Sequence, residues 1–291
     1  MKNTYIDFHT HSTRSDGAFT PEEVCIKAIE HGIKILALTD HNYIEDLSSL
    51  RKQFPDLHLV QGCEFSSIYT TSYNQEIEVH VIGLGFNPNH PKIQALLAKN
   101  DPDLAPYIRA ILERLRECNI DLGSYEDMQR HYPNNRKIGR TNVATYMVEK
   151  GYVNSVDEAL DIYIGSYGQK RAYVEKKVQF VSMEEAISAI IEAGGVAILA
   201  HLYYYDMSDE ENIVLIKRFK ELSGNHGGIE VYYGAYSNQQ RETLKQLADQ
   251  YQLMYSAASD FHGKRLIDTL DNQFLSIDCQ ELLNHLGFEK D

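Results

Sequence analysis

The opening stretch YIDFHTHSTRSDG places two histidines one residue apart at the end of a short apolar run. Side chains alternate between the two faces of a β-strand, so His9 and His11 are expected to project from the same face. Two neighbouring imidazoles at a strand end either hold a metal ion or remain as polar groups in a core. Asp16, in the loop that follows, is the first carboxylate that could join them.

The same residue types recur at or near the ends of other apolar runs. Together with the first three residues they make a set of nine, completed by His41, Glu64, His80, His201, Asp260 and His262. Imidazole and carboxylate together suit divalent Zn, Mn or Fe. Nine groups are too many for one ion but suffice for two or three, with one carboxylate shared. His80 lies within EVHVIG rather than at a clear strand end, so a buried core histidine is the alternative there.

A cluster of this kind would serve phosphoester chemistry. Metal ions about 3.5–4 Å apart activate a bridging water and stabilise the oxygens of a transferring phosphoryl group. The expected reaction is therefore hydrolysis by a metal-bridged hydroxide.

Repeated strand–helix–strand units must position these residues. The segment TPEEVCIKAIEHG predicts a helix with a Thr20–Glu23 capping box, and Ser182–Glu185 and Ser237–Gln240 open two later helices in the same way. Such repeats imply parallel strands with right-handed crossovers. The C-terminal ends of parallel barrel strands form one face, where active sites are built. The predicted fold class is therefore α/β, with the polar set at the rim of a barrel-like sheet.

The middle of the chain changes character. Two more strands are expected around residues 57–65 and 77–86, and from about residue 91 to residue 178 the pattern is helical and more charged. We therefore expect a barrel domain formed by 1–90 and 179–291, with a helical insertion at 91–178 that caps the substrate.

The bulk composition limits the partners. A formal net charge of −14 over 291 residues argues against a basic surface for duplex DNA. A small phosphorylated substrate is compatible with this charge, because bound metal ions reverse the local sign. The four cysteines are scattered and the sequence shows no membrane-spanning run, so a cytoplasmic protein is expected. The sequence leaves the oligomeric state open.

Six segments of the chain together resemble the PHP (polymerase and histidinol phosphatase) family, and they occur in the family's order. They are DFHTHSTRSDG, LALTDHN, GCEFS, HVIGLG, LAHL and SDFHG. The segment KIGRTNVATYMVEKGYVNSVDEALDIYIG is similar to its branch of nucleoside-monophosphate phosphatases and 5′→3′ exonucleases acting on short RNA and 3′,5′-bisphosphonucleotides. The resemblance implies a distorted (β/α)7 TIM-like barrel and two or three divalent ions, which are Mn, Zn, Fe or Mg in the family.

The resemblance also implies a ligand set for each ion. One would be held by His9, His11, Glu64 and Asp260, a second by Glu64, His80 and His201, and a third by Asp16, His41 and His262. Three departures from the family pattern matter: AHP becomes His201-Leu202, a frequent IGRPH becomes IGR followed by Thr141-Asn142, and GGSDFHG becomes AASDFHG. None removes an expected ligand, and the second would alter substrate choice.

Several residues are candidates for substrate contact or catalysis. Arg140 is the preferred phosphate clamp, because guanidinium binds phosphate oxygens bidentately; a surface arginine is the alternative. Arg14 and Lys170 are further candidates, each of which could instead be an ordinary solvated side chain. The remaining expectations are Asn142 as a substrate-binding residue and Asp16 and His41 as catalytic residues together with Arg140.

The predicted function is a metal-dependent phosphoesterase hydrolysing nucleotides with a 5′-phosphate or a 3′,5′-bisphosphate. A 5′→3′ exonuclease on short RNA is the first alternative, ahead of a histidinol phosphatase or a non-catalytic metal-binding module. A hydrolase of C–N bonds is disfavoured, because no lysine stands at a strand end to bridge two metals.

Overall fold

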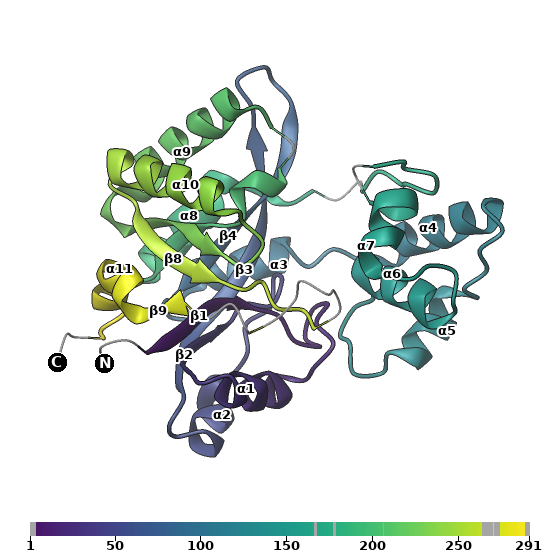
Figure 1. The fold of residues 1–291 in the computed structure, drawn as a ribbon, viewed down its shortest axis with the longest axis horizontal. Coiled ribbons are helices and arrows are strands. Elements are labelled where there is room, and N and C mark those ends of the chain that lie inside the picture. The colour runs from purple at the N-terminus through teal and green to yellow at the C-terminus, as the bar shows by residue number, and fades with distance from the viewer. Residues whose placement is uncertain are drawn as a thin grey trace.

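Seven strands form the main sheet of the computed structural model, and two short strands extend it (Figure 1). The structure describes residues 4–165, 168–176, 179–205, 207–263, 270 and 274–288. The strands are β1 (Tyr5–Thr10), β2 (Ile33–Leu38), β3 (His58–Thr70), β4 (Glu76–Leu84), β5 (Val181–Ser182), β6 (Val196–Leu199), β7 (Gly227–Tyr233), β8 (Met254–Ala258) and β9 (Phe274–Leu275). Their order is β8-β7-β6-β4-β3-β2-β1-β9, and β5 pairs with β3.

The predicted parallel strands are present on both sides of the sheet, and an antiparallel hairpin lies between them. β1, β2 and β3 are parallel neighbours, as are β6, β7 and β8, whereas β4 is antiparallel to both β3 and β6. The hairpin turn has a backbone hydrogen bond from Thr71 N–H to the Gln75 carbonyl, and Asn74 adopts a positive φ of 63°. Because β4 runs antiparallel to β3, residues in the middle of β4 lie at the same end of the sheet as the C-terminal ends of the parallel strands.

The two edges of the sheet meet at the first and last of the seven main strands. The segment after β8 pairs with the end of β1, through His11 N–H to the Phe261 carbonyl and Asp260 N–H to the His9 carbonyl, both 2.9 Å. The sheet is therefore a nearly closed, distorted barrel of the predicted class.

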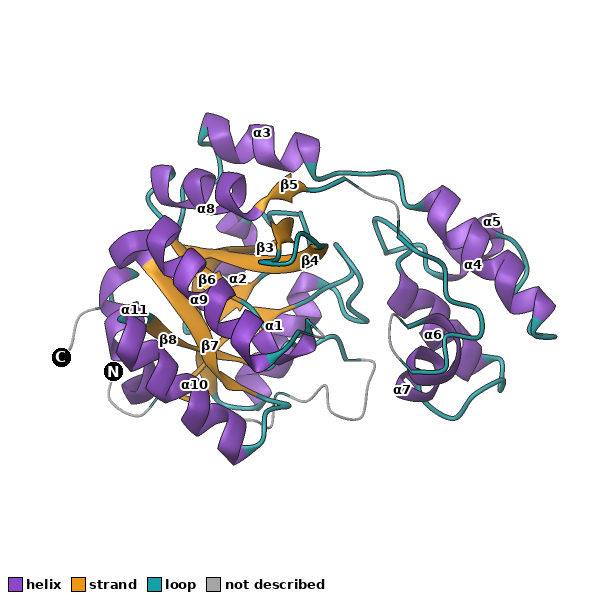
Figure 2. Cartoon of the chain, turned by 90° about the horizontal axis from the view of Figure 1, so that it is seen from above, coloured by secondary structure: helices purple, strands orange, loops and turns teal. Residues whose placement is uncertain are grey.

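Helices cover the outside of this barrel (Figure 2). The three predicted capping boxes are confirmed at the starts of α1, α8 and α10. The barrel helices are α1 (Pro21–Glu30), α2 (Leu47–Gln53), α3 (Pro91–Lys99), α8 (Met183–Glu192), α9 (Asp209–Ser223), α10 (Asn238–Tyr251) and α11 (Gln280–His285). Among the helices that the structure describes, none has the length and apolar character needed to cross a bilayer.

The helical insertion stands to one side of the barrel (Figure 1). It contains α4 (Ala105–Glu117), α5 (Tyr125–His131), α6 (Arg140–Glu149), α7 (Val156–Ala159) and the π-helical turn η1 (Leu160–Ile164). These elements bury their own apolar cluster, which includes Ile108, Leu115 and Met147. Helix α3, which the predicted boundary at residue 91 assigned to the insertion, instead packs Ile93 and Leu96 into a core cluster of the barrel. The bounds of the insertion stay a prediction.

Candidate metal centre

The nine imidazole and carboxylate side chains lie together at the rim of the barrel. They come from the end of β1 and its loop, the segment after β2, the middle of β3 and β4, the segment after β6 and the segment after β8. Three overlapping groups have ligand atoms within 4.8 Å of one another: His11, Asp16, His41 and His262; His9, His11 and Asp260; and His41, Glu64 and His80. The structure therefore brings together the residues that the sequence singled out.

Glu64 occupies the centre of the cluster. Its Oε2 lies 3.3 Å from His9 Nε2, 3.2 Å from His11 Nε2 and 2.9 Å from His41 Nδ1. Its Oε1 lies 2.8 Å from His80 Nδ1 and 3.0 Å from His201 Nε2. Burial alone would raise the pKa of the Glu64 carboxyl, but the surrounding imidazoles hold it well below its ordinary value. One carboxylate thus faces five imidazoles.

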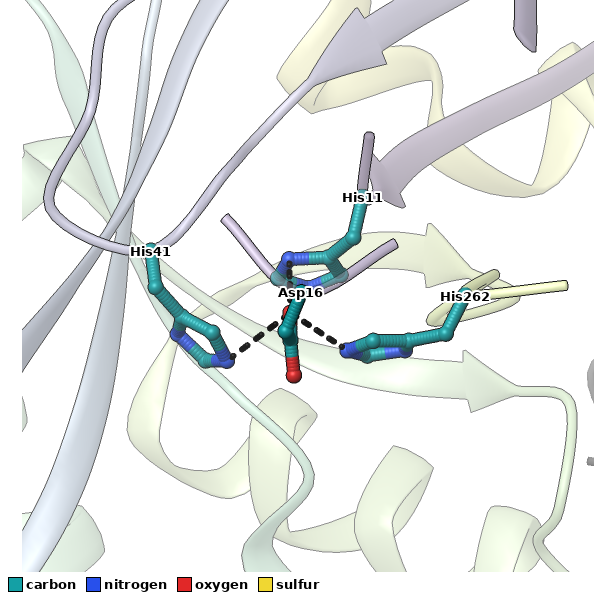
Figure 3. Close-up of side chains that lie close together, drawn as sticks. All are labelled: His11, Asp16, His41 and His262. Carbon is teal, nitrogen blue, oxygen red and sulfur yellow. Dashed lines mark ion pairs between the residues drawn. The ribbon is translucent and has the colours of Figure 1, made fainter. Parts of the chain in front are cut away.

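Asp16 forms the centre of a second group (Figure 3). Its Oδ1 lies 3.2 Å from His262 Nε2, 3.7 Å from His11 Nδ1 and 3.9 Å from His41 Nε2. Burial would raise the pKa of Asp16, and the imidazoles of His262 and His41 lower it well below its usual range. Asp16 is therefore an anion facing three histidines.

Asp260 bridges the first strand and the last. Its Oδ1 lies 3.3 Å from the Nε2 atoms of both His9 and His11, and its Oδ2 accepts a hydrogen bond of 2.6 Å from the Tyr233 hydroxyl. Asp260 has a φ of 55° and His201 a φ of 24°, conformations that side-chain-bearing residues rarely adopt. Such strain gathers at functional sites, where the surrounding structure maintains it.

The donor set fits divalent cations. Glu64 Oε2, His41 Nδ1 and His201 Nδ1 are buried and have no hydrogen-bond partner of good geometry among the described residues. Buried polar atoms normally have such partners, and a bound ion would supply them. Mixed imidazole and carboxylate donors are the ligands of Zn, Mn and Fe.

Further buried groups, outside the predicted set, orient these side chains. Glu230 in β7 places Oε1 2.7 Å from His9 Nδ1, while its Oε2 accepts a 2.6 Å hydrogen bond from the His201 N–H. The only feature of the sequence that points to Glu230 is that it is a charged residue inside the apolar run GIEVYYG. Carboxylates that hold the outer nitrogen of a ligating histidine fix its ring orientation and raise its basicity.

Asp40 organises the loop that carries Asp16. Its Oδ1 accepts hydrogen bonds from Ser12 N–H at 2.8 Å, from Ser15 N–H at 3.1 Å and from the Ser15 hydroxyl at 2.6 Å, and its Oδ2 accepts from the Ser12 hydroxyl at 2.7 Å. Asp40 therefore acts on the site by fixing a neighbouring loop.

The candidate substrate residues have different surroundings. Arg140 is the first residue of α6, near the Tyr107 hydroxyl, whose pKa is raised by burial and lowered in part by this guanidinium. Within the described residues Arg140 has no carboxylate partner, whereas Arg14 pairs with Glu45 through Nε to Oε2 at 2.7 Å. Lys170 is exposed, with its ammonium 5.6 Å from the centre of the Tyr173 ring.

Asn142 is completely buried in the third position of α6. Its Oδ1 accepts a 2.9 Å hydrogen bond from the Gly139 N–H and so caps the helix that starts with Arg140. Its Nδ2 has no hydrogen-bond partner among the described residues. A role in binding substrate stays a prediction for all four residues.

Comparison with known proteins agrees with this geometry. Residues 7–257 match the PHP domain. The chain is 31% identical over 260 residues to the 5′-3′ exoribonuclease Rnm of Salmonella typhimurium, covering 88% of this chain and 84% of the relative. It is 33% identical over 269 residues to the 3′,5′-nucleoside bisphosphate phosphatase of Chromobacterium violaceum, covering 89% and 87%.

A solved structure has the same fold. It is described as an amidohydrolase from Chromobacterium violaceum with bound sulfate and no metal, and it superposes with a TM-score of 0.76 at 31% identity, over 89% of this chain and 87% of the other. The sequence match, the fold and the clustered ligands lead to one assignment. The chain belongs to the PHP family of metal-dependent phosphoesterases.

Proposed function

We propose that this phosphoesterase acts on nucleotides that carry a 5′-phosphate or a 3′,5′-bisphosphate. The observation that carries the proposal is the cluster of nine groups at one rim. Eight of them form three overlapping sets of metal donors, and the ninth, His201, places Nε2 3.0 Å from Glu64 Oε1. The relatives named as a bisphosphate phosphatase and as an exoribonuclease both act on nucleotide phosphates, which favours a nucleotide substrate here.

We assign the ligands as the resemblance to the family implies, although His41 Nδ1 also lies 2.9 Å from Glu64 Oε2. His9, His11, Glu64 and Asp260 would hold one ion, Glu64, His80 and His201 a second, and Asp16, His41 and His262 a third. When bound, divalent ions would supply Lewis-acid activation of water and stabilisation of charge on phosphate oxygens. Glu230 and Tyr233 would hold His9 and Asp260 in the orientation that this task requires.

Arg140 would bind the substrate phosphate from the insertion side. A guanidinium without a carboxylate partner in the described structure is available for bidentate contact with phosphate oxygens. Arg14 is the weaker candidate, because its contact with Glu45 would have to be exchanged for the substrate.

A 5′→3′ exonuclease on short RNA is the second candidate, and the relatives of that name support it. The two activities differ in whether the site admits a second nucleotide beside the reacting phosphate. A substrate series therefore separates them.

The test is a panel of phosphoesters assayed after loading with Mn²⁺, Zn²⁺ or Mg²⁺. It contains an aryl phosphate, AMP, adenosine 3′,5′-bisphosphate, a short 5′-phosphorylated RNA and histidinol phosphate. Release of phosphate from the bisphosphate or AMP supports the proposal, whereas release of mononucleotides from RNA alone selects the exonuclease.

Two variants test the metal cluster itself. His11→Ala and Asp260→Ala should lose nearly all activity and bound metal, while the exposed His226→Ala serves as a control with wild-type values. Equal activity in all three variants would reject the assigned site.

A further inference from the structure

Asp16 is held from two opposite sides. One carboxylate oxygen, Oδ1, faces His262, His11 and His41 (Figure 3). The other, Oδ2, accepts a hydrogen bond of 3.1 Å from the Thr141 hydroxyl, which belongs to α6 of the insertion. The barrel supplies Asp16 and its histidines, and the insertion supplies the group behind the carboxylate.

The neighbouring contacts show that this is a docked surface rather than one isolated bond. Arg136 N–H donates to the Thr13 carbonyl at 3.2 Å, and Asn135 Nδ2 lies 3.4 Å from the carbonyl oxygens of Ser15 and Gly17. A Cβ atom added at Gly139 would lie 3.8 Å from Asp16 Cβ, so the start of α6 approaches Asp16 closely. Residues 135–141 of the insertion therefore rest on the loop that carries Asp16.

The hydrogen bond from the Thr141 hydroxyl restricts the rotation of the Asp16 carboxylate group. A carboxylate can turn about its Cβ–Cγ bond, and a donor fixed on Oδ2 leaves Oδ1 directed toward the three imidazoles. Thr141 is itself fixed, because the Asn142 side chain caps the same helical turn by accepting from the Gly139 N–H.

We propose that Thr141 is a positioning residue through which the insertion completes the metal site at Asp16. Occupancy of that site then depends on the insertion lying against the barrel. The inference rests on the proposed function in one respect, namely that Asp16, His41 and His262 bind a metal ion.

The experiment measures metal binding without any substrate. Full-length apoprotein is titrated with Mn²⁺ and, separately, Zn²⁺ by calorimetry, and bound metal is counted by elemental analysis after gel filtration. The variants are Thr141→Val, which removes the hydroxyl and keeps the shape, Thr141→Ser, which keeps the hydroxyl, and Thr145→Val. Thr145 is a matched control, since its hydroxyl donates to the Thr141 carbonyl within α6 rather than to Asp16. Circular dichroism and thermal unfolding establish that each variant is folded.

We expect Thr141→Val to weaken one metal equivalent about tenfold, as loss of a group behind a ligating side chain does elsewhere. The other equivalents should be unchanged, and Thr141→Ser and Thr145→Val should bind like the wild type. Equal affinity of Thr141→Val and Thr145→Val for every equivalent would overturn this inference alone. A wild-type protein that binds no metal would overturn the proposed function as well, so the two failures are distinguishable.

Discussion

Glu230 is a single side chain that connects two of the proposed ligands. Its two oxygens meet the His9 ring and the His201 backbone N–H at the same time. Burial would lower the pKa of His9, and the carboxylates of Glu64, Glu230 and Asp260 raise it well above its ordinary value. The negative charge of Glu230 therefore favours a metal or a proton on the other nitrogen of this ring.

Glu230→Gln tests this role. An amide cannot accept from both His9 and the His201 N–H, because one of its two polar atoms is a donor, so metal affinity should fall about 10- to 100-fold. Calorimetric titration with Mn²⁺ measures the change. Glu211→Gln is the matched control: Glu211 is equally buried, at 3% exposure, but bonds Tyr69 and Ser72 away from the cluster. Equal metal affinities in the two variants would contradict the prediction.

Arg140→Ala tests the phosphate clamp at the same scale. Hydrogen bonds to charged groups contribute roughly 1.5–3 kcal/mol, so kcat/KM for a nucleotide phosphate should fall about 10- to 100-fold, mainly through KM. Metal content should not change, since Arg140 is outside the ligand set. Arg130→Ala, an exposed arginine of the same insertion, supplies the comparison. An unchanged kcat/KM in Arg140→Ala would exclude the clamp.

Among the elements, α5 shows how a local cap contributes to stability. Ser124 and Asp127 form a capping box at its start. Hydrogen bonds from the Ser124 hydroxyl and backbone N–H, with Arg130 nearby, lower the pKa of Asp127 to about 2. A carboxyl whose pKa falls on folding stabilises the folded state above its ordinary pKa and loses that contribution as the pH falls through the lowered value.

Asp127→Asn should therefore lower the Tm at pH 7, and its difference from the wild type should shrink as the pH falls from about 4 toward 2. Thermal unfolding followed by circular dichroism over that range measures both effects. A difference in Tm that stays constant down to pH 2 would show that the charge of Asp127 does not contribute.

The elements also show where sequence reasoning succeeds. Caps such as Thr20–Glu23 and the ligand His11 are recognisable because their signals are local: a spacing of three residues, or a polar group ending an apolar run. Glu230 was not predicted, because its partner His9 is 221 residues away and only the closed barrel brings them together. The boundary at residue 91 rested on helical periodicity, which does not say whether α3 packs on the barrel or on the insertion. His80 lies within a strand rather than at its end, so the sequence alone does not place it at the rim. The antiparallel β3–β4 hairpin brings it there.

At the scale of the molecule, the chain has separate apolar cores in the barrel and in the insertion. Leu115→Ala, in the insertion core, should lower the free energy of unfolding of that part by about 2–5 kcal/mol through loss of contacts and the cavity left behind. Hydrogen exchange should accelerate in residues 105–164 and stay slow in the barrel strands. Ile216→Ala, in a barrel core, should accelerate exchange in the barrel and leave residues 105–164 slow. If exchange became faster throughout the chain in both variants, the two cores would unfold as one unit.

The pairing of β1 with the segment after β8 also affects how the protein is made. Synthesis runs from the N-terminal to the C-terminal side, so His9 and His11 are made well before Asp260 and His262. Until Asp260 has been made, the two histidines lack one of the two carboxylates that lie near both of them in the fold; the other, Glu64, is already in the chain. A nascent chain therefore cannot assemble the complete set of donors until the segment after β8 has been synthesised.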